Sequence, residues 1–316
     1  MSTFVTLLGY LAVAYIAYQI VDFIRLHVLR KSDLRKYGAK DGAYALVTGA
    51  SDGIGKGFAE ALARAGFNVI LTARRKEVLE QVANDIAGRY KVKAVAIASD
   101  ASKPDAVEKL TSEIHSYNIR VLVNNVGVNT EYPTKFEQCS IEDISRMLDV
   151  NINFTTKLTY AMIPKLSVAR GRSLILMLSS YSGVTPVPMM AVYSSSKAYI
   201  DFFGRALATE LAPSGIDVRS IVPHYVVSQM SRFRRATISV PDPLPFATSA
   251  LKKIDHGFSI APHWLHDIQT RITKWIPDSI AGPLGFKMMS RARTAIIAAN
   301  ERRKQKEAQM AKAQTS

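Results

Sequence analysis

The sequence is poor in cysteine and in acidic side chains. Its 316 residues include one cysteine, Cys139, which excludes an internal disulfide framework and therefore a small disulfide-stapled secreted module. Charged residues make up 21% of the chain and aromatic residues 9%, which is typical of a folded protein and not of a mainly disordered one. The six histidines lack a zinc-ligand spacing such as H-E-x-x-H, so no metal site is expected.

The shortage of acidic residues leaves a net charge of +15, with 41 Lys and Arg against 26 Asp and Glu. Residues 1–40 carry six basic and two acidic side chains, residues 41–224 carry 20 and 18, and residues 225–316 carry 15 and six. The excess therefore lies at the two ends of the chain. A nucleic-acid enzyme would more often carry its basic surface across the folded core, so no nucleic-acid partner is expected.

A long apolar run is present near the N-terminus. Phe4 to Ile24 contains no Lys or Arg, and as a helix it would span roughly 30 Å, the thickness of a bilayer core. A cleaved signal peptide would need a basic start and a small-residue cleavage site, and a buried core helix would need a polar face, neither of which is evident. The segment is predicted to be a transmembrane helix whose following residues are cytosolic, because basic side chains come directly after it: Arg25, Arg30, Lys31, Arg35, Lys36 and Lys40.

From residue 43 short apolar runs alternate with helical patterns. The helices expected include 56–65, 104–117 and 193–212. Continuous apolar strands between helices predict a doubly wound, Rossmann-type α/β fold with a parallel sheet. The strands expected are 44–47, 68–71, 92–98, 121–124, 173–178 and 217–222.

The first expected strand runs into a glycine-rich turn that opens a helix. Gly49, Gly53 and Gly55 would let backbone N–H groups approach a pyrophosphate at the helix N-terminus. At the end of the second strand NAD enzymes usually place an acid, whereas this chain has Arg74 and Arg75. A guanidinium suits a 2′-phosphate, so NADP(H) is predicted over NAD(H), with Arg75 open to a plain surface role.

A second constellation lies further along the chain. Tyr193 and Lys197 are four apart on one helical face, and Ser180 ends a strand thirteen residues before the tyrosine. A nearby ammonium is expected to lower the tyrosine pKa and make it a usable acid or base.

Together these motifs closely resemble the short-chain dehydrogenase/reductase family over about residues 43–230. The matching elements are residues 48–55, residues 124–127, Asn151, Ser180 and residues 193–197. The resemblance implies that Tyr193 donates a proton to the substrate carbonyl, Ser180 orients it, Lys197 tunes its pKa and binds ribose, and Asn151 holds a relay water. It implies cofactor contacts from Gly49, Ser51, Gly53, Ile54, Gly55, Arg74, Asp100, Asn124, Asn125, Tyr193, Lys197, Val226 and Ser228.

The sequence departs from the family pattern at three points. The Pro-Gly often found after the sixth strand is Pro223-His224, and the hydroxyl expected soon afterwards is Ser228 instead of threonine. Asp52 stands where NADP-binding members often have a basic residue, which leaves Arg74 as the main argument for NADP(H).

The N-terminal anchor and the basic C-terminal part narrow the resemblance to membrane-bound very-long-chain 3-oxoacyl-CoA reductases, relatives of 17β-hydroxysteroid dehydrogenases. That resemblance implies NADPH-dependent reduction of long-chain 3-oxoacyl-CoA in fatty-acid elongation at the endoplasmic reticulum membrane, beside the other elongation enzymes. A steroid or retinoid dehydrogenase on the same scaffold, and a noncatalytic lipid- or protein-binding scaffold, stay open as alternatives.

Three parts are expected: an anchor with its basic flank (1–40), a catalytic domain (41–230) and a helical, basic C-terminal extension toward substrate and membrane lipids (231–316). Within the extension, Arg232, Arg234 and Arg235 are candidates for coenzyme A phosphates. An amphipathic helix is expected within residues 262–277, either on the membrane or packed on the domain. Its apolar stripe consists of Trp264, Leu265, Ile268, Ile272, Trp275 and Ile276.

Overall fold

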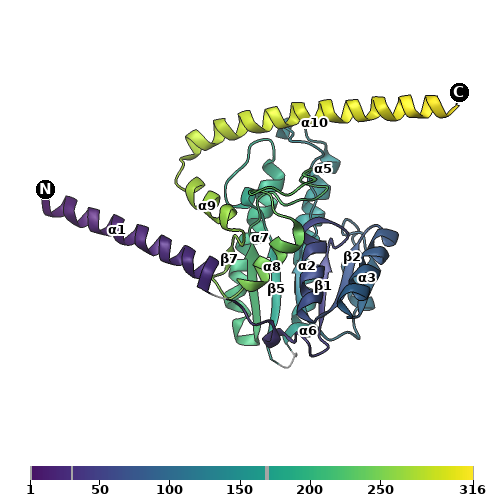
Figure 1. The fold of residues 1–316 in the computed structure, drawn as a ribbon, viewed down its shortest axis with the longest axis horizontal. Coiled ribbons are helices and arrows are strands. Elements are labelled where there is room, and N and C mark those ends of the chain that lie inside the picture. Colours follow the sequence, from purple (N-terminus) through teal and green to yellow (C-terminus); the bar gives the residue numbers. More distant parts are fainter. Residues whose placement is uncertain (1, 30, 168–170, 316) are drawn as a thin grey trace.

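The computed structural model describes residues 2–29, 31–167 and 171–315. Their centre is a parallel sheet of seven strands in the order β3-β2-β1-β4-β5-β6-β7 (Figure 1). This confirms the Rossmann-type α/β prediction. The strands are β1 (Tyr44–Thr48), β2 (Asn68–Ala73), β3 (Ala94–Ala98), β4 (Ile119–Asn124), β5 (Ser173–Leu178), β6 (Ile216–Ile221) and β7 (Ser259–Ile260).

Helices cover both faces of the sheet and create two cores. α2 (Gly53–Ala65), α3 (Lys76–Tyr90) and α8 (Pro243–Lys252) pack on one face, while α4 (Ala106–Glu113), α6 (Thr155–Ser167) and α7 (Ala191–Glu210) pack on the other. Within β2, Val69 and Leu71 point into the first core and Ile70 into the second. Two buried faces explain why the strands are apolar at successive positions.

Several expected boundaries differ from the structure by two to four residues. The third strand begins at Ala94 instead of residue 92, and the helix expected over 104–117 is the shorter α4, since Ile114 already leaves helical geometry. β7 was not expected, because two residues carry too little periodicity to signal a strand.

The strand order reverses between β1 and β4, the neighbours that carry the chain to opposite halves of the sheet. In open α/β sheets, the carboxyl ends of the strands at such a point form the ligand-binding crevice. The loops after β1, β4, β5 and β6 therefore define where a site must lie.

The N-terminal helix projects away from the sheet. α1 (Ser2–Ile24) continues into a short π-helix, η1 (Arg25–Leu29), and together they include a candidate membrane span, Thr3–Leu29, whose most apolar window has no buried residue (Figure 1). One N-terminal apolar helix of this length fits a single-pass membrane anchor. Arg30, one of the basic residues expected after the anchor, lies outside the described residues.

The end of α1 is held to the catalytic part by a polar network. Asp22 Oδ2 accepts a hydrogen bond of 2.6 Å from Arg271, and its Oδ1 lies 3.1 Å from His256 Nε2. The Arg271 guanidinium also bonds Gln19 and donates to both carboxylate oxygens of Asp267 at 3.0 Å. Charge-assisted, partly buried hydrogen bonds of this kind fix geometry as well as adding energy.

We expect Arg271→Gln to loosen α1 from the domain, because it leaves two facing carboxylates without their shared cation. Loss of such hydrogen bonds should raise the rate of tryptic cleavage between residues 25 and 43 by about tenfold in detergent-solubilised protein. Arg271→Lys, which keeps the charge, should give a smaller increase. Equal cleavage rates in all three proteins would show that the network does not hold the helix.

The C-terminal extension contains two further helices, α9 (Trp264–Thr273) and α10 (Asp278–Thr315). The buried face of α9 is polar, formed by His266, Asp267 and Thr270, whereas Ile272 and Trp275 are 58% and 71% exposed. Of the predicted apolar stripe, Trp264, Ile272 and Trp275 are exposed, whereas Leu265, Ile268 and Ile276 are half-buried. The polar face packs on the domain, and contact of the exposed side with a membrane stays a prediction. The edge of Trp275 meets Tyr15 of α1, with ring centroids 5.7 Å apart.

Candidate active site

The loop between β1 and α2 is shaped by glycines that no other residue could replace without strain. Gly49 and Gly53 have φ of +65° and +55°, in the left-handed region. A Cβ on Gly55 would lie 2.3 Å from the Gly49 carbonyl oxygen, and one on Gly53 would lie 2.7 Å from Ser228 Cβ. Ser51 and Ile54 complete this turn into the N-terminus of α2, where N–H groups are free to bind an anion.

The residues after β4 brace the glycine loop. Asn125 Nδ2 donates to the Thr48 and Gly49 carbonyl oxygens at 2.8 and 3.2 Å, and Thr48 Oγ1 accepts from the Asn125 backbone N–H at 2.9 Å. Asn124 turns into the core instead, where its Nδ2 donates to Thr159 Oγ1 at 2.8 Å. Asn124 and Asn125 therefore support the site, because the side-chain N–H groups of both residues already donate to protein atoms.

Arg74 stands exposed at the end of β2, with no carboxylate within ion-pair distance in the described part of the chain. Asp100, at the end of β3, accepts from the Ser102 N–H and hydroxyl at 3.1 and 2.8 Å. Burial acts to raise the pKa of Asp100, but these bonds and the nearby Arg74 charge lower it overall. A free guanidinium beside a carboxylate that stays ionised suits the adenosine end of a phosphorylated dinucleotide.

The loop after β6 closes over the glycine loop. Val226 is buried, and Ser228 Oγ, which faces Gly53, accepts from the Ser231 N–H at 3.1 Å. Asp52 accepts from the Gln229 N–H at 2.9 Å. Asp52, which stands where NADP-binding members often have a basic residue, therefore joins the glycine loop to the loop after β6.

The structure brings the predicted triad together. Ser180 ends β5, while Tyr193 and Lys197 project from the first turns of α7, and a hydrogen bond links Ser180 to the tyrosine hydroxyl. Lys197 is buried, donates to the Leu178 carbonyl oxygen at 2.8 Å, and places its Nζ 5.8 Å from the centroid of the Tyr193 ring. Such an arrangement can deliver a proton to a carbonyl oxygen.

The direction of the tyrosine shift is opposite to the one that the sequence predicts. Burial of the hydroxyl group raises the pKa of Tyr193 to about 12, and the hydrogen bond from Ser180 only partly opposes this. Burial also lowers the pKa of Lys197 to about 8. Desolvation is the largest cause of the Tyr193 shift, and the Lys197 ammonium bonds a backbone carbonyl oxygen instead of the phenol. A tyrosine with this pKa stays protonated, as a proton donor requires.

Asn151 lies in a π-helical turn, η4 (Asp149–Phe154), between α5 (Ile141–Leu148) and α6. Its Oδ1 accepts from the Val128 N–H at 2.8 Å, and its Nδ2 donates to the Val128 carbonyl oxygen and to Ser196 Oγ, both at 3.0 Å. Single π-turns of this kind are frequent at functional sites. The side chain joins the β4 loop to α7, which leaves one lone pair of Oδ1 for a water.

His224, which stands where the family often has glycine, connects the site to α9. Its ring stacks near Tyr181, with centroids 4.1 Å apart, and its Nε2 lies 2.9 Å from Thr270 Oγ1. Burial, with the neighbouring His266 and His263, lowers the pKa of His224 to about 3, so the ring is neutral. The imidazole fills space that glycine would leave open beside the strand end.

The C-terminal extension, expected to lie toward the substrate, places α10 against residues 131–134. Arg293 donates to the Pro133 carbonyl oxygen at 2.9 Å and stacks over Tyr132, while Asn300 Nδ2 donates to Glu131 Oε1 at 2.7 Å. These contacts fix residues 130–134, which lie beside the segment that leads into α7. Arg232, one of the candidates for coenzyme A phosphates, donates to the Glu131 carbonyl oxygen at 2.8 Å, and its contact with coenzyme A stays a prediction. Neither Arg293 nor Asn300 belongs to a motif that could have revealed this role.

Comparison with known proteins agrees with this geometry. Residues 43–239 match the family model described as short chain dehydrogenase. The chain belongs to this family of oxidoreductases.

Similar proteins have names that specify a substrate, which the family model does not. The very-long-chain 3-oxoacyl-CoA reductase of Lodderomyces elongisporus is 35% identical over 298 residues, covering 89% of this chain and 85% of the relative. Very-long-chain 3-oxoacyl-CoA reductase-A of Danio rerio is 36% identical over 277 residues, covering 87% and 86%. A short-chain dehydrogenase from Sphingobium yanoikuyae, solved with NADPH, superposes with a TM-score of 0.63 at 25% identity, covering 74% of this chain and 96% of that one.

Proposed function

We propose that the protein reduces long-chain 3-oxoacyl-CoA to 3-hydroxyacyl-CoA with NADPH. The observation that carries this proposal is the match to reductases of that name along 89% and 87% of the chain, beyond the family domain alone. The proton-donating site described above supplies the chemistry that the reaction needs.

The shape of the glycine loop and the position of Arg74 fit NADPH. The glycine loop leaves no room for side chains where a pyrophosphate would approach, and Arg74 offers an uncommitted guanidinium for the 2′-phosphate. NADPH would supply the hydride. The proposed contacts are those of Gly49, Ser51, Gly53, Ile54, Gly55, Arg74, Asp100, Asn124, Asn125, Tyr193, Lys197, Val226 and Ser228, with Asn124 and Asn125 acting by bracing.

The catalytic roles follow from the protonation states. Tyr193 donates its proton to the C3 oxygen as the hydride reaches C3, so ketone, hydride and proton together give the alcohol. Ser180 orients the tyrosine and the carbonyl oxygen through its hydroxyl group. Lys197 holds positive charge near the developing phenolate, and Asn151 positions the water that returns a proton.

The pH dependence of reduction should report Lys197. Its pKa of about 8 means that the side chain is charged below pH 8 and loses its charge as the pH rises, whereas Tyr193 stays protonated up to about pH 12. We expect kcat/KM for reduction to fall about tenfold per pH unit above pH 8. A profile that is flat to pH 10 would contradict the role of Lys197.

We also propose the three-part division into an anchor with basic flank (1–40), a catalytic domain (41–230) and a substrate- and membrane-facing extension (231–316). Basic residues directly after the apolar helix support a cytosolic catalytic domain. The endoplasmic reticulum, contact with membrane lipids and association with the other enzymes of fatty-acid elongation belong to the same proposal. They rest on the activity named for the relatives.

A substrate panel tests the function. Full-length protein in detergent is supplied with NADPH and, in separate reactions, with a long-chain 3-oxoacyl-CoA, a 17-ketosteroid and retinal, and cofactor oxidation is followed. The expected result is a kcat/KM for the acyl-CoA at least tenfold above the others. A preference for the steroid or the retinoid would replace the proposal with that activity.

A further inference from the structure

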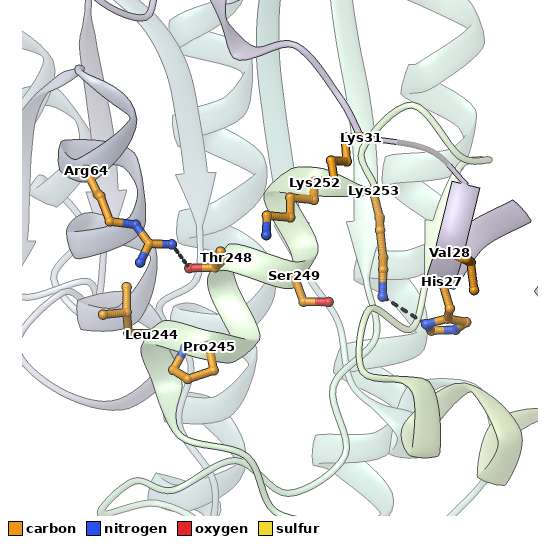
Figure 2. A pocket seen from close by; sticks show the side chains of 10 residues that line it. All are labelled: His27, Val28, Lys31, Arg64, Leu244, Pro245, Thr248, Ser249, Lys252 and Lys253. Carbon is orange, nitrogen blue, oxygen red and sulfur yellow. Dashed lines mark hydrogen bonds between the residues drawn. The ribbon is translucent and has the colours of Figure 1, made fainter. Parts of the chain in front are cut away.

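A cavity of about 550 Å³ lies where the end of the N-terminal helix meets α8 and α2 (Figure 2). It is separate from the cofactor site, because Arg64 lies in the last turn of α2 while the glycine loop forms the first turn. Its walls come from η1, the segment after it, α2 and α8. The residues that line it are His27, Val28, Lys31, Arg64, Leu244, Pro245, Thr248, Ser249, Lys252 and Lys253.

The cavity is strongly basic and contains no carboxylate. Four of its ten lining residues are Lys or Arg, one is histidine and none is Asp or Glu. Across the described ranges, none of these four cations forms an ion pair with an acidic side chain. The exposed side chains of Lys31 and Lys252 are therefore available to an anion.

Two of the cations are oriented by neighbouring side chains, and one of these, His27, lies 3.1 Å from Asp267 Oδ2. The Arg64 guanidinium donates to Thr248 Oγ1 at 2.9 Å, and Lys253 Nζ lies 2.8 Å from His27 Nδ1 (Figure 2). Lys253 Nζ also donates to the Pro262 carbonyl oxygen at 2.5 Å, and burial lowers the pKa of Lys253 to about 8, although the Asp267 charge opposes this shift. An arginine held by one hydrogen bond keeps most of its donors for a ligand.

The cavity also lies at the level of the membrane surface if α1 spans a bilayer. His27 and Val28 belong to the last turn of the candidate span, and Val28 is exposed. Leu244 and Pro245 add a small apolar wall on the other side. A ligand here would have its anionic part among cations and its apolar part beside the anchor helix.

We propose that this cavity binds the headgroup of an anionic phospholipid that carries a phosphomonoester. Such a phosphate bears a charge of about −1.5 to −2 at pH 7 and three acceptor oxygens, which match several separate cations better than a single charge does. Basic pockets beside membrane helices are known to bind lipid headgroups. The site is independent of the reductase chemistry.

Binding is measured on the full-length protein in a neutral detergent, with dioctanoyl phosphatidate as the probe and calorimetry as the readout. The test variant is Lys31→Gln/Lys252→Gln, since neither side chain contributes a hydrogen bond to the described structure. With about 1 kcal/mol per basic residue near a lipid surface, the variant should bind roughly 30-fold more weakly. Unfolding temperature is recorded for each protein to confirm folding.

The matched control is Arg89→Gln/Lys93→Gln, which removes two exposed charges at the far edge of the sheet near α3. It should bind phosphatidate like the wild type. Glycerol 3-phosphate tests for a soluble ligand, and dioctanoyl phosphatidylcholine tests for charge. No phosphatidate binding, equal weakening in both double variants, or glycerol 3-phosphate binding as tightly as phosphatidate would each overturn the proposal.

Discussion

Replacing Tyr193 with phenylalanine is expected to reduce NADPH-dependent turnover by about a hundredfold to ten-thousandfold. The change removes one hydroxyl group, the proposed proton donor beside Ser180, and general acid catalysis contributes 10²–10⁴-fold in such sites. Initial rates with a long-chain 3-oxoacyl-CoA at pH 7 give the measurement. NADPH binding, followed by quenching of protein fluorescence, should change by less than threefold.

Tyr199→Phe is the matched control, because it removes the same group from the same helix. Tyr199 Oη lies 3.0 Å from Thr156 Oγ1 at the protein surface, away from Ser180. Its turnover should stay within twofold of wild type. Tyr193→Phe protein that retains activity would refute the mechanism, and cells that keep normal elongation with this variant while losing it on deletion would favour the noncatalytic scaffold.

Arg74→Glu is expected to reverse the cofactor preference. The change removes a charge-assisted bond to the 2′-phosphate and adds repulsion, which together should raise the KM for NADPH about 100-fold. NADH has no 2′-phosphate, so its kcat/KM should not fall and its ribose hydroxyls gain an acceptor. The ratio of the two kcat/KM values is the decisive quantity.

The neighbouring residue provides the control for this change. Arg75 precedes α3, and its exposed side chain has no carboxylate within ion-pair distance in the described ranges. Arg75→Glu should alter the KM for NADPH by less than threefold, through long-range charge alone. If Arg74→Glu weakens NADPH and NADH equally, the residue supports folding and not phosphate recognition.

The parts of the fold that sequence could predict are those with a local signal. The sheet was predictable because each strand is apolar at successive positions, and the glycine loop because positive φ restricts Gly49 and Gly53 to one residue type. Tyr193 and Lys197 share a helical face by spacing alone, and Ser180 lies at a strand end that the same pattern locates.

The remaining features depend on tertiary packing between elements that are distant in the sequence. The direction of the Tyr193 pKa shift follows from how deeply its hydroxyl group is buried, which spacing does not encode. The polar face of α9 turns inward, where Arg271 bonds both Asp267 and Asp22. The local sequence pattern of α9 does not predict this orientation. The same is true of Arg293, which reaches the site only because α10 crosses over residues separated from it by 160 positions.

If α1 spans a bilayer, the network between Asp22 and Arg271 ties the position of the catalytic domain to bilayer thickness. The network lies within the candidate span Thr3–Leu29, so only about 16 residues precede it, roughly 24 Å of helix, which is less than the roughly 30 Å of an average hydrocarbon core. Because α1 is clamped to α9, the catalytic domain must move with it as one body. A thinner membrane would then turn the mouth of the active site to a different angle and height above the lipid, and turnover of bilayer-dissolved substrate would change without any change in the site itself.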